Sequence, residues 1–159
     1  MIKALVTDFS RVLIFPADDT YVGGLNALQK ELTAKGSYAF WDYFRLNQDL
    51  LTFYKELRTQ IGVYMFTSEY IQEHPALQSY VDGVFQGVFS GARLGLKKTR
   101  VESYTEIARS IGLPPQQILY VDDHEANGGV ARSAGMVVVR FESNSQAMRD
   151  IRRMLQSAA

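Results

Sequence analysis

The chain has 159 residues, of which 47% are hydrophobic, and this size and composition fit one compact domain with a core of its own. The 17 basic and 17 acidic residues balance, so the overall charge gives no reason to expect binding to nucleic acid or to a membrane surface. The sequence has no cysteine and only two histidines, which excludes disulfides and thiolate–zinc clusters and leaves oxygen atoms as the main ligands for any metal.

The chain opens with a short apolar run, residues 2–7, that leads directly to Asp8. This run is too short for a signal peptide or a membrane-spanning helix. We therefore expect a cytoplasmic protein, and the absence of cysteine agrees with that compartment.

Short apolar runs predict four buried strands, and stretches with helical spacing of apolar residues lie between them. The helix expected over 99–111, called the capped helix below, has the clearest bounds, because Thr99 and Glu102 form a Thr-x-x-Glu capping box and Gly112 marks its end. Alternating strands and helices predict an α/β fold, a three-layer, Rossmann-like, doubly wound parallel sheet. The expected strands are 2–7, 63–66, 118–121 and 136–139, and the expected helices are about 46–61, 99–111 and 148–155.

Residues 13–45 interrupt this alternation. They contain a loop, a short helix over about 25–32 that is closed by Gly36, and an aromatic run, 38–44, that needs burial. We interpret 13–45 as a small helical cap insertion within the single domain 1–159, placed to cover the strand ends as a lid. The aromatic run is either the core of this lid or a contact in a homodimer.

Polar side chains follow three of the predicted strands, and a lysine pair precedes the capped helix. Since the carboxyl ends of parallel strands meet at one edge of a sheet, we expect these side chains to converge there. Three carboxylates at one edge repel each other unless they hold a hard cation, most simply Mg²⁺, and a lysine with a hydroxyl group suits a phosphate beside it. The pattern indicates phosphoryl transfer. The side chains are Asp8, Thr67-Ser68, Asp122-Asp123 and Lys97-Lys98.

These residues lie, in chain order, in four motifs that together resemble those of the haloacid dehalogenase (HAD) superfamily, with a reduced cap and an atypical first motif, Asp-Phe-Ser-Arg. The resemblance covers nearly the whole chain, and four motifs in order at strand ends are hard to produce by chance. The motifs are LVTDFSRVL around Asp8, VYMFTSEY around Thr67, GLKKTRVESY around Lys98 and ILYVDDHEANGGVARSAGM around Asp122 and Asp123.

The resemblance implies a role for each matching residue. Asp8 is the nucleophile that forms an aspartyl-phosphate, and Lys98 is expected to hold the phosphate, although Lys97 competes for this role. The spacing to Tyr104 favours Lys98. Asn127 either orients the site or is a plain amide on a helix face. The implied phosphate ligands also include Thr67 and its alternate Ser68, and the implied Mg²⁺ ligands are Asp8, Asp122, Asp123 and the main-chain carbonyl of Ser10.

Two positions depart from the family pattern. Ser10 stands where most family phosphatases have a second Asp that acts as acid and base, and losing that group lowers a rate roughly 10²–10⁴-fold. Arg11 stands where the family usually has Gly, and it either clamps a phosphate or carboxylate or is an exposed turn residue.

Two functions follow from these patterns. The first is a HAD-like hydrolase, a Mg²⁺-dependent phosphatase acting on a small phosphorylated metabolite, with weakened acid/base catalysis. The alternative, motivated by Ser10 and Arg11, is a catalytically impaired HAD-like module that binds phosphate or a protein partner. A receiver-type signalling domain uses similar groups but places the acidic pair after the first strand, which is the reverse of the order seen here.

Overall fold

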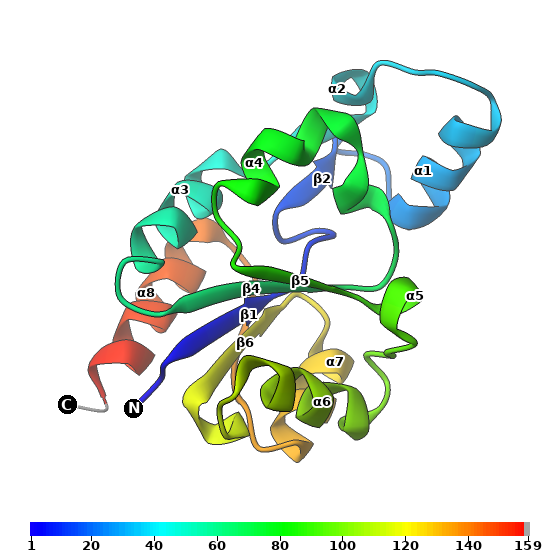
Figure 1. The fold of residues 1–159 in the computed structure, drawn as a ribbon. Coiled ribbons are helices and arrows are strands. Elements are labelled where there is room, and N and C mark those ends of the chain that lie inside the picture. The colour runs from blue at the N-terminus through cyan, green and yellow to red at the C-terminus, as the bar shows by residue number, and fades with distance from the viewer. Residues whose placement is uncertain (158–159) are drawn as a thin grey trace.

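A five-stranded parallel sheet in the order β5-β4-β1-β6-β7 forms the centre of the protein in a computed structural model, which describes residues 1–157. Helices lie on both faces of the sheet (Figure 1). The predicted α/β, doubly wound parallel architecture is therefore confirmed, and each predicted strand is present. The strands are β1 (Ala4–Thr7), β4 (Gly62–Thr67), β5 (Gly87–Ser90), β6 (Ile118–Asp122) and β7 (Val137–Arg140).

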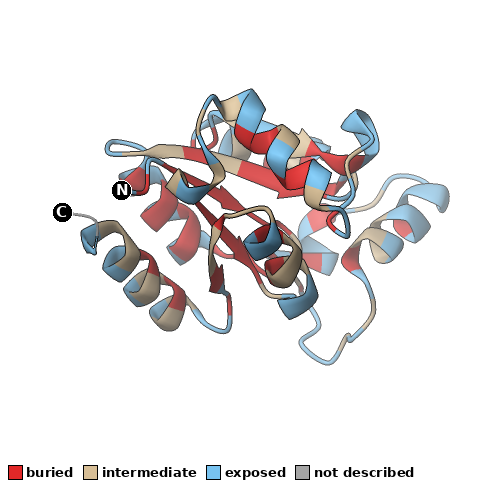
Figure 2. Ribbon diagram, turned by 90° about the horizontal axis from the view of Figure 1, so that it is seen from below, coloured by how far each residue is buried: buried red, intermediate tan, exposed pale blue. Residues whose placement is uncertain are grey.

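The helices divide between the two faces because successive strand residues point to opposite sides. In β1, Leu5 belongs to one buried cluster with helices α3 and α8, and Ala4 and Val6 belong to the other with α6 and α7. The central strands β1 and β6 are thus buried on both sides of the sheet (Figure 2). The helices outside the 13–46 segment are α3 (Gln48–Leu57), α4 (Gln78–Asp82), α5 (Gly91–Leu94), α6 (Val101–Ile111), α7 (Glu125–Ser133) and α8 (Asn144–Gln156), with 3₁₀ turns η1 (Ile71–Glu73), η2 (Pro75–Leu77) and η3 (Pro115–Gln117).

The capped helix is present at the predicted position, but the prediction of where it begins is wrong. α6 ends at Ile111, where Gly112 takes a left-handed conformation with a φ of 79°, as expected. The predicted Thr99–Glu102 capping box does not form, because the N-cap residue is Arg100 and its side chain makes no capping hydrogen bond. Instead, the Ser103 hydroxyl accepts a hydrogen bond from the Lys97 N–H at 2.9 Å, and the chain turns at residues 98–99 before the helix begins.

The segment predicted as an insertion forms a small unit next to the sheet (Figure 1). It contains β2 (Ile14–Pro16), α1 (Leu25–Ala34), α2 (Phe40–Tyr43) and β3 (Phe44–Leu46), and β2 pairs with β3 in antiparallel fashion. Two of the five aromatic residues in the run 38–44 are buried, and these two, Phe40 and Phe44, stack with ring centroids 4.6 Å apart. Trp41 and Tyr43 remain 45% and 42% exposed.

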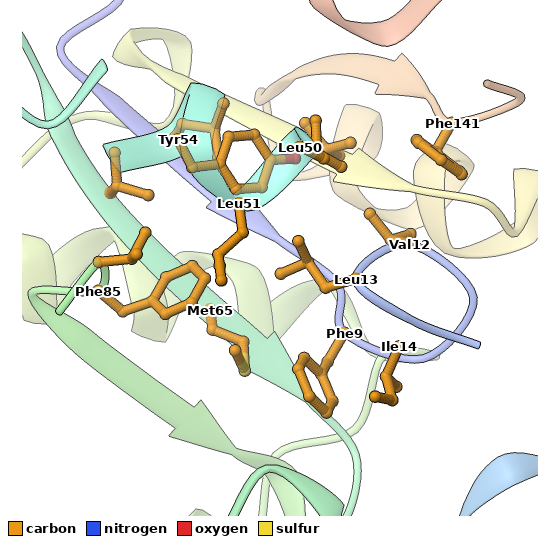
Figure 3. Close-up of a cluster of buried hydrophobic side chains, with 14 of the residues drawn as sticks. Phe9, Val12, Leu13, Ile14, Leu50, Leu51, Tyr54, Met65, Phe85 and Phe141 are labelled. Carbon is orange, nitrogen blue, oxygen red and sulfur yellow. The ribbon is translucent and has the colours of Figure 1, made fainter. Parts of the chain in front are cut away.

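The loop that follows β1 is fixed by its own apolar residues. Phe9, Val12, Leu13 and Ile14 are buried, and they pack against Leu50, Tyr54 and Met65 in the close-up of Figure 3. The Phe9 carbonyl accepts hydrogen bonds from the N–H groups of Leu13 and Ile14 at 2.8 and 3.0 Å. The loop is therefore a tight, packed turn that holds the preceding Asp8 at the end of its strand.

None of the helices within residues 1–157 combines the length and apolar composition that crossing a membrane requires.

Candidate functional site

Three carboxylates meet at the carboxyl edge of the sheet. β1 lies between β4 and β6, so Asp8 at the end of β1 is adjacent to Asp122 at the end of β6. Each of Asp8, Asp122 and Asp123 has a carboxylate oxygen within 4.8 Å of the others. Asp8 and Asp122 are buried and Asp123 is half-buried. The convergence predicted from the strand ends is thus present in the structure.

Lys98 is the cation that the structure brings to this group. Its ammonium forms ion pairs with Asp8 Oδ1 and, at 3.1 Å, with Asp122 Oδ2. Its side chain is only 8% exposed, whereas the neighbouring Lys97 side chain is exposed. The Tyr104 hydroxyl donates to the Lys98 carbonyl at 3.0 Å and fixes the backbone there. Of the two lysines, Lys98 has the geometry required for the site.

Asp122 is the most strongly hydrogen-bonded carboxylate of the three. Its Oδ1 accepts from the His124 N–H at 2.8 Å, and its Oδ2 accepts from the Tyr120 hydroxyl at 2.5 Å. The Asn127 side-chain amide donates to both oxygens, at 3.3 and 3.1 Å. These donors, together with Lys98, compensate for removing the charge from water.

Burial and mutual repulsion set the ionisation of the carboxylates. Burial raises the pKa of Asp8 to about 6; Lys98 opposes this shift and Asp122 adds to it. Burial also raises the pKa of Asp123, with a further contribution from Asp122. For Lys98, burial acts to lower the pKa, but the two carboxylates outweigh it and the pKa is raised. One buried lysine thus stays charged while the carboxylates compete for it.

The donor atoms at this edge fit a hard divalent cation such as Mg²⁺. All the candidate ligands are oxygens, which is the set that Mg²⁺ prefers, and three carboxylates exceed the charge that one lysine can balance. In addition, the Ser10 hydroxyl is buried and has no hydrogen-bond partner within residues 1–157. An unsatisfied polar atom of this kind requires an explanation, and a polar ligand at the site supplies one.

The candidate phosphate ligands Thr67 and Ser68 follow β4, which neighbours β1 on the other side. Thr67 is buried and Ser68 is exposed. Ser68 lines an open cleft of about 510 Å³ together with Lys98 and Asn127. Lys98, whose ammonium contacts Asp8, thus forms part of the wall of this cleft.

Arg11 makes a contact that the sequence analysis did not anticipate. Within residues 1–157 it is the one residue other than glycine with a positive φ, 58°, a conformation that glycine adopts without steric cost. Its guanidinium donates to the carbonyls of Tyr21 and Gly23 at 3.1 and 2.7 Å. Arg11 thereby ties the loop after Asp8 to the segment that leads into α1.

Tyr120 is a residue that the sequence analysis did not assign to the site. In the sequence it is one member of an apolar strand, but its position two residues before Asp122 places both side chains on the same face of β6. That spacing is the signal that could have identified it.

Comparison with known proteins shows which solved structures share this fold. No family model matches the chain. Among solved structures, a HAD-superfamily hydrolase of subfamily IA from Geobacter sulfurreducens is 17% identical, with a TM-score of 0.71 over 97% of this chain and 96% of that one. A HAD family enzyme from Bacteroides thetaiotaomicron, solved as an Asp-to-Ala mutant in complex with magnesium and inorganic phosphate, is 16% identical, with a TM-score of 0.67 over 91% and 96%.

The sequence is also similar to those of curated phosphatases. Enolase-phosphatase E1 of Methylococcus capsulatus is 32% identical over 132 residues, which is 79% of this chain and 57% of that protein. The chain thus has the fold of these HAD-family enzymes and is similar in sequence to enolase-phosphatases. The chain spans about half the length of the curated relatives that it matches.

Replacing Lys98 should destabilise the protein far more than replacing its neighbour. Lys98→Met leaves buried carboxylates without their cation, which is expected to cost about 3–5 kcal/mol of unfolding free energy. Lys97→Met changes an exposed side chain and is expected to stay within about 0.5 kcal/mol of wild type. Urea unfolding in the presence of EDTA measures the unfolding free energy of both variants. Equal stability of the two variants would show that Lys98 does not neutralise the carboxylates.

Two substitutions of Arg11 separate its backbone conformation from its hydrogen bonds. Arg11→Ala and Arg11→Gly both lose the guanidinium contacts, but only glycine adopts a positive φ without strain. We expect Arg11→Gly to be more stable than Arg11→Ala by about 1 kcal/mol in urea unfolding.

The matched control for Arg11 is Arg109, an exposed arginine inside α6. There the order should reverse, since alanine is favoured over glycine in a helix by about 1 kcal/mol. If Arg11→Gly were no more stable than Arg11→Ala, the left-handed conformation at position 11 would not contribute to the stability of the protein.

Proposed function

We propose that this protein is a Mg²⁺-dependent phosphatase that uses Asp8 as its nucleophile. The observation that carries the proposal is the contact between Asp8 and the buried Lys98, inside a group of three carboxylates at the end of the sheet. Two kinds of relative add support: curated phosphatases with 32% identity, and a structurally similar enzyme solved with magnesium and inorganic phosphate.

In this proposal each side chain acts from the position that it already occupies. Asp8, Asp122 and Asp123, with the Ser10 carbonyl, would hold the Mg²⁺, which would supply the charge neutralisation that an anionic phosphate needs to approach. Lys98 and Thr67, with Ser68 as the alternate, hold the phosphate oxygens. The Asp8 carboxylate attacks phosphorus and the P–O bond to the leaving group breaks, with the departing oxygen taking its proton from solvent. Water then cleaves the aspartyl-phosphate, which returns the Asp8 carboxylate and releases inorganic phosphate. Asn127 orients Asp122 through its amide.

The departure of the leaving group is the weak step. A serine hydroxyl at position 10 is too weak an acid near neutral pH to protonate the leaving oxygen, so turnover is expected to be slow. Substrates with good leaving groups need no such acid and should react fastest. The open cleft beside Lys98 suits a small phosphorylated metabolite.

The second candidate function is a catalytically impaired module that binds phosphate or a protein partner. Two observations favour it: Ser10 replaces the expected acid, and the Arg11 guanidinium is already engaged with the carbonyls of Tyr21 and Gly23. Under this hypothesis the carboxylate group and Lys98 bind their ligand without turning it over.

A phosphatase assay with Mg²⁺ on three proteins distinguishes these functions. The wild type should hydrolyse an activated aryl phosphate, Asp8→Asn should reduce the rate to background because the nucleophile is lost, and Ser10→Asp should raise it by roughly 10²–10⁴-fold on substrates with poor leaving groups. Equal rates for wild type and Asp8→Asn would contradict the nucleophilic role of Asp8.

Two further outcomes bear on the binding hypothesis. If the wild type is inert and Ser10→Asp turns substrate over, the site is assembled and lacks only its acid. If no variant has activity, and beryllium fluoride with Mg²⁺ gives no thermal shift, the phosphatase proposal fails altogether.

We further propose that residues 13–45 act as a reduced lid and that a homodimer forms through the aromatic run of this lid. Trp41 and Tyr43 are large, exposed side chains in that run. Size-exclusion chromatography with light scattering should give twice the chain mass for the wild type and the monomer mass for Trp41→Ser. A monomeric wild type at high micromolar concentration would contradict the dimer.

A further inference from the structure

A layer of three aromatic rings lies directly beneath the charged site. The side chains of Phe66, Tyr104 and Tyr120 come from β4, α6 and β6, and all three are fully buried. The ring of Tyr104 meets the other two edge to face, with centroids 5.5 Å from Phe66 and 5.2 Å from Tyr120. Rings packed in this way have little freedom to move, so a hydroxyl group on them is held at a fixed point.

The Tyr120 hydroxyl points at one oxygen of Asp122. Tyr120 and Asp122 are two residues apart on β6 and therefore project from the same face of the strand. The distance from the hydroxyl to Asp122 Oδ2 is 2.5 Å, which is typical of a charge-assisted O–H···O⁻ bond. The Tyr120 hydroxyl is the donor in this hydrogen bond.

The other donors to Asp122 are less well fixed on that oxygen. The His124 N–H holds Oδ1, and the Asn127 amide is shared between both oxygens at 3.3 and 3.1 Å. The Lys98 ammonium is shared with Asp8 and sits at the end of a flexible side chain. The Tyr120 hydroxyl is thus the short, rigid contact that sets how Oδ2 faces the rest of the site.

We infer that Tyr120 is a positioning residue for metal binding: its hydroxyl holds the Asp122 carboxylate in the orientation in which it ligates Mg²⁺. The inference rests on the proposed function, since it takes Asp122 as a metal ligand. Partners that orient a ligand in this way generally contribute 10-fold to 100-fold, roughly, to metal affinity. Tyr120 itself does not touch the metal or the phosphate in this scheme.

Removing only the hydroxyl group tests the inference. Tyr120→Phe keeps the ring and its packing against Tyr104, and isothermal titration of the metal-free protein with MgCl₂ should show a dissociation constant raised by roughly 10-fold to 100-fold. The matched control is Tyr54→Phe. Tyr54 is equally buried, but its hydroxyl bonds to the Thr7 hydroxyl at 3.1 Å and makes no contact with a metal carboxylate. This control should bind Mg²⁺ as the wild type does.

A second measurement keeps the test valid if Tyr120→Phe is less stable. Urea unfolding at a series of MgCl₂ concentrations gives the affinity from the gain in stability, because a ligand of the folded state stabilises it in proportion to ln(1 + [Mg²⁺]/Kd). A protein with only a structural need for the hydroxyl would lose stability equally at every Mg²⁺ concentration. A positioning role predicts a loss that grows as Mg²⁺ is added.

The outcomes separate this inference from the proposed function. If the wild type binds Mg²⁺ and Tyr120→Phe binds it equally well, Tyr120 is no positioning residue, and the phosphatase proposal is unaffected. If the wild type itself does not bind Mg²⁺, the metal site of the proposed function fails, and the inference fails with it. Weakened binding in both Tyr120→Phe and Tyr54→Phe would also overturn the inference, because the effect would then belong to any buried hydroxyl.

Discussion

The buried ion pairs of Lys98 with Asp8 and Asp122 are the interaction on which the rest of this structure depends. Burying two carboxylates is costly unless a cation accompanies them, and within residues 1–157 Lys98 provides the ion pairs to both. To bring its ammonium inward the chain turns at residues 98–99, and this is why α6 begins at Val101 and not at the capping box that the sequence suggested. A local capping preference is worth about 1 kcal/mol, less than leaving buried carboxylates unpaired.

Much of the fold could be predicted because the central strands are buried on both faces and therefore appear as uninterrupted apolar runs. The site could be predicted from the same fact. Asp8 directly follows one such run and Asp122 ends another, and parallel strands bring their carboxyl ends together. β5 was not predicted, because Gly87–Ser90 is a short strand at the edge of the sheet whose side chains are mostly half-buried or exposed. An edge strand has no continuous apolar run to mark it.

The details of the site could not be predicted, because they depend on contacts between distant parts of the chain. Tyr120 looks like any apolar strand residue until the neighbouring Tyr104 ring is known to fix it beneath Asp122. Arg11 left two interpretations open, and the structure gives a third, a tether to carbonyls ten and twelve residues further along. Residue type and spacing identify which groups can carry chemistry, but only packing decides which atoms they contact.

The contacts that hold Asp8 do not include the side chain at position 10. Replacing that side chain therefore need not disturb the position of Asp8. Asp8 is held by the packed loop after β1 and by Lys98, and neither contact involves the side chain at position 10. A second carboxylate there would add negative charge next to Asp8, whose pKa burial already raises to about 6. Serine avoids that repulsion and leaves Asp8 more readily ionised. Under the proposed function, a chain with Ser10 would therefore hold a phosphate next to an ionised carboxylate better than it would release the leaving group.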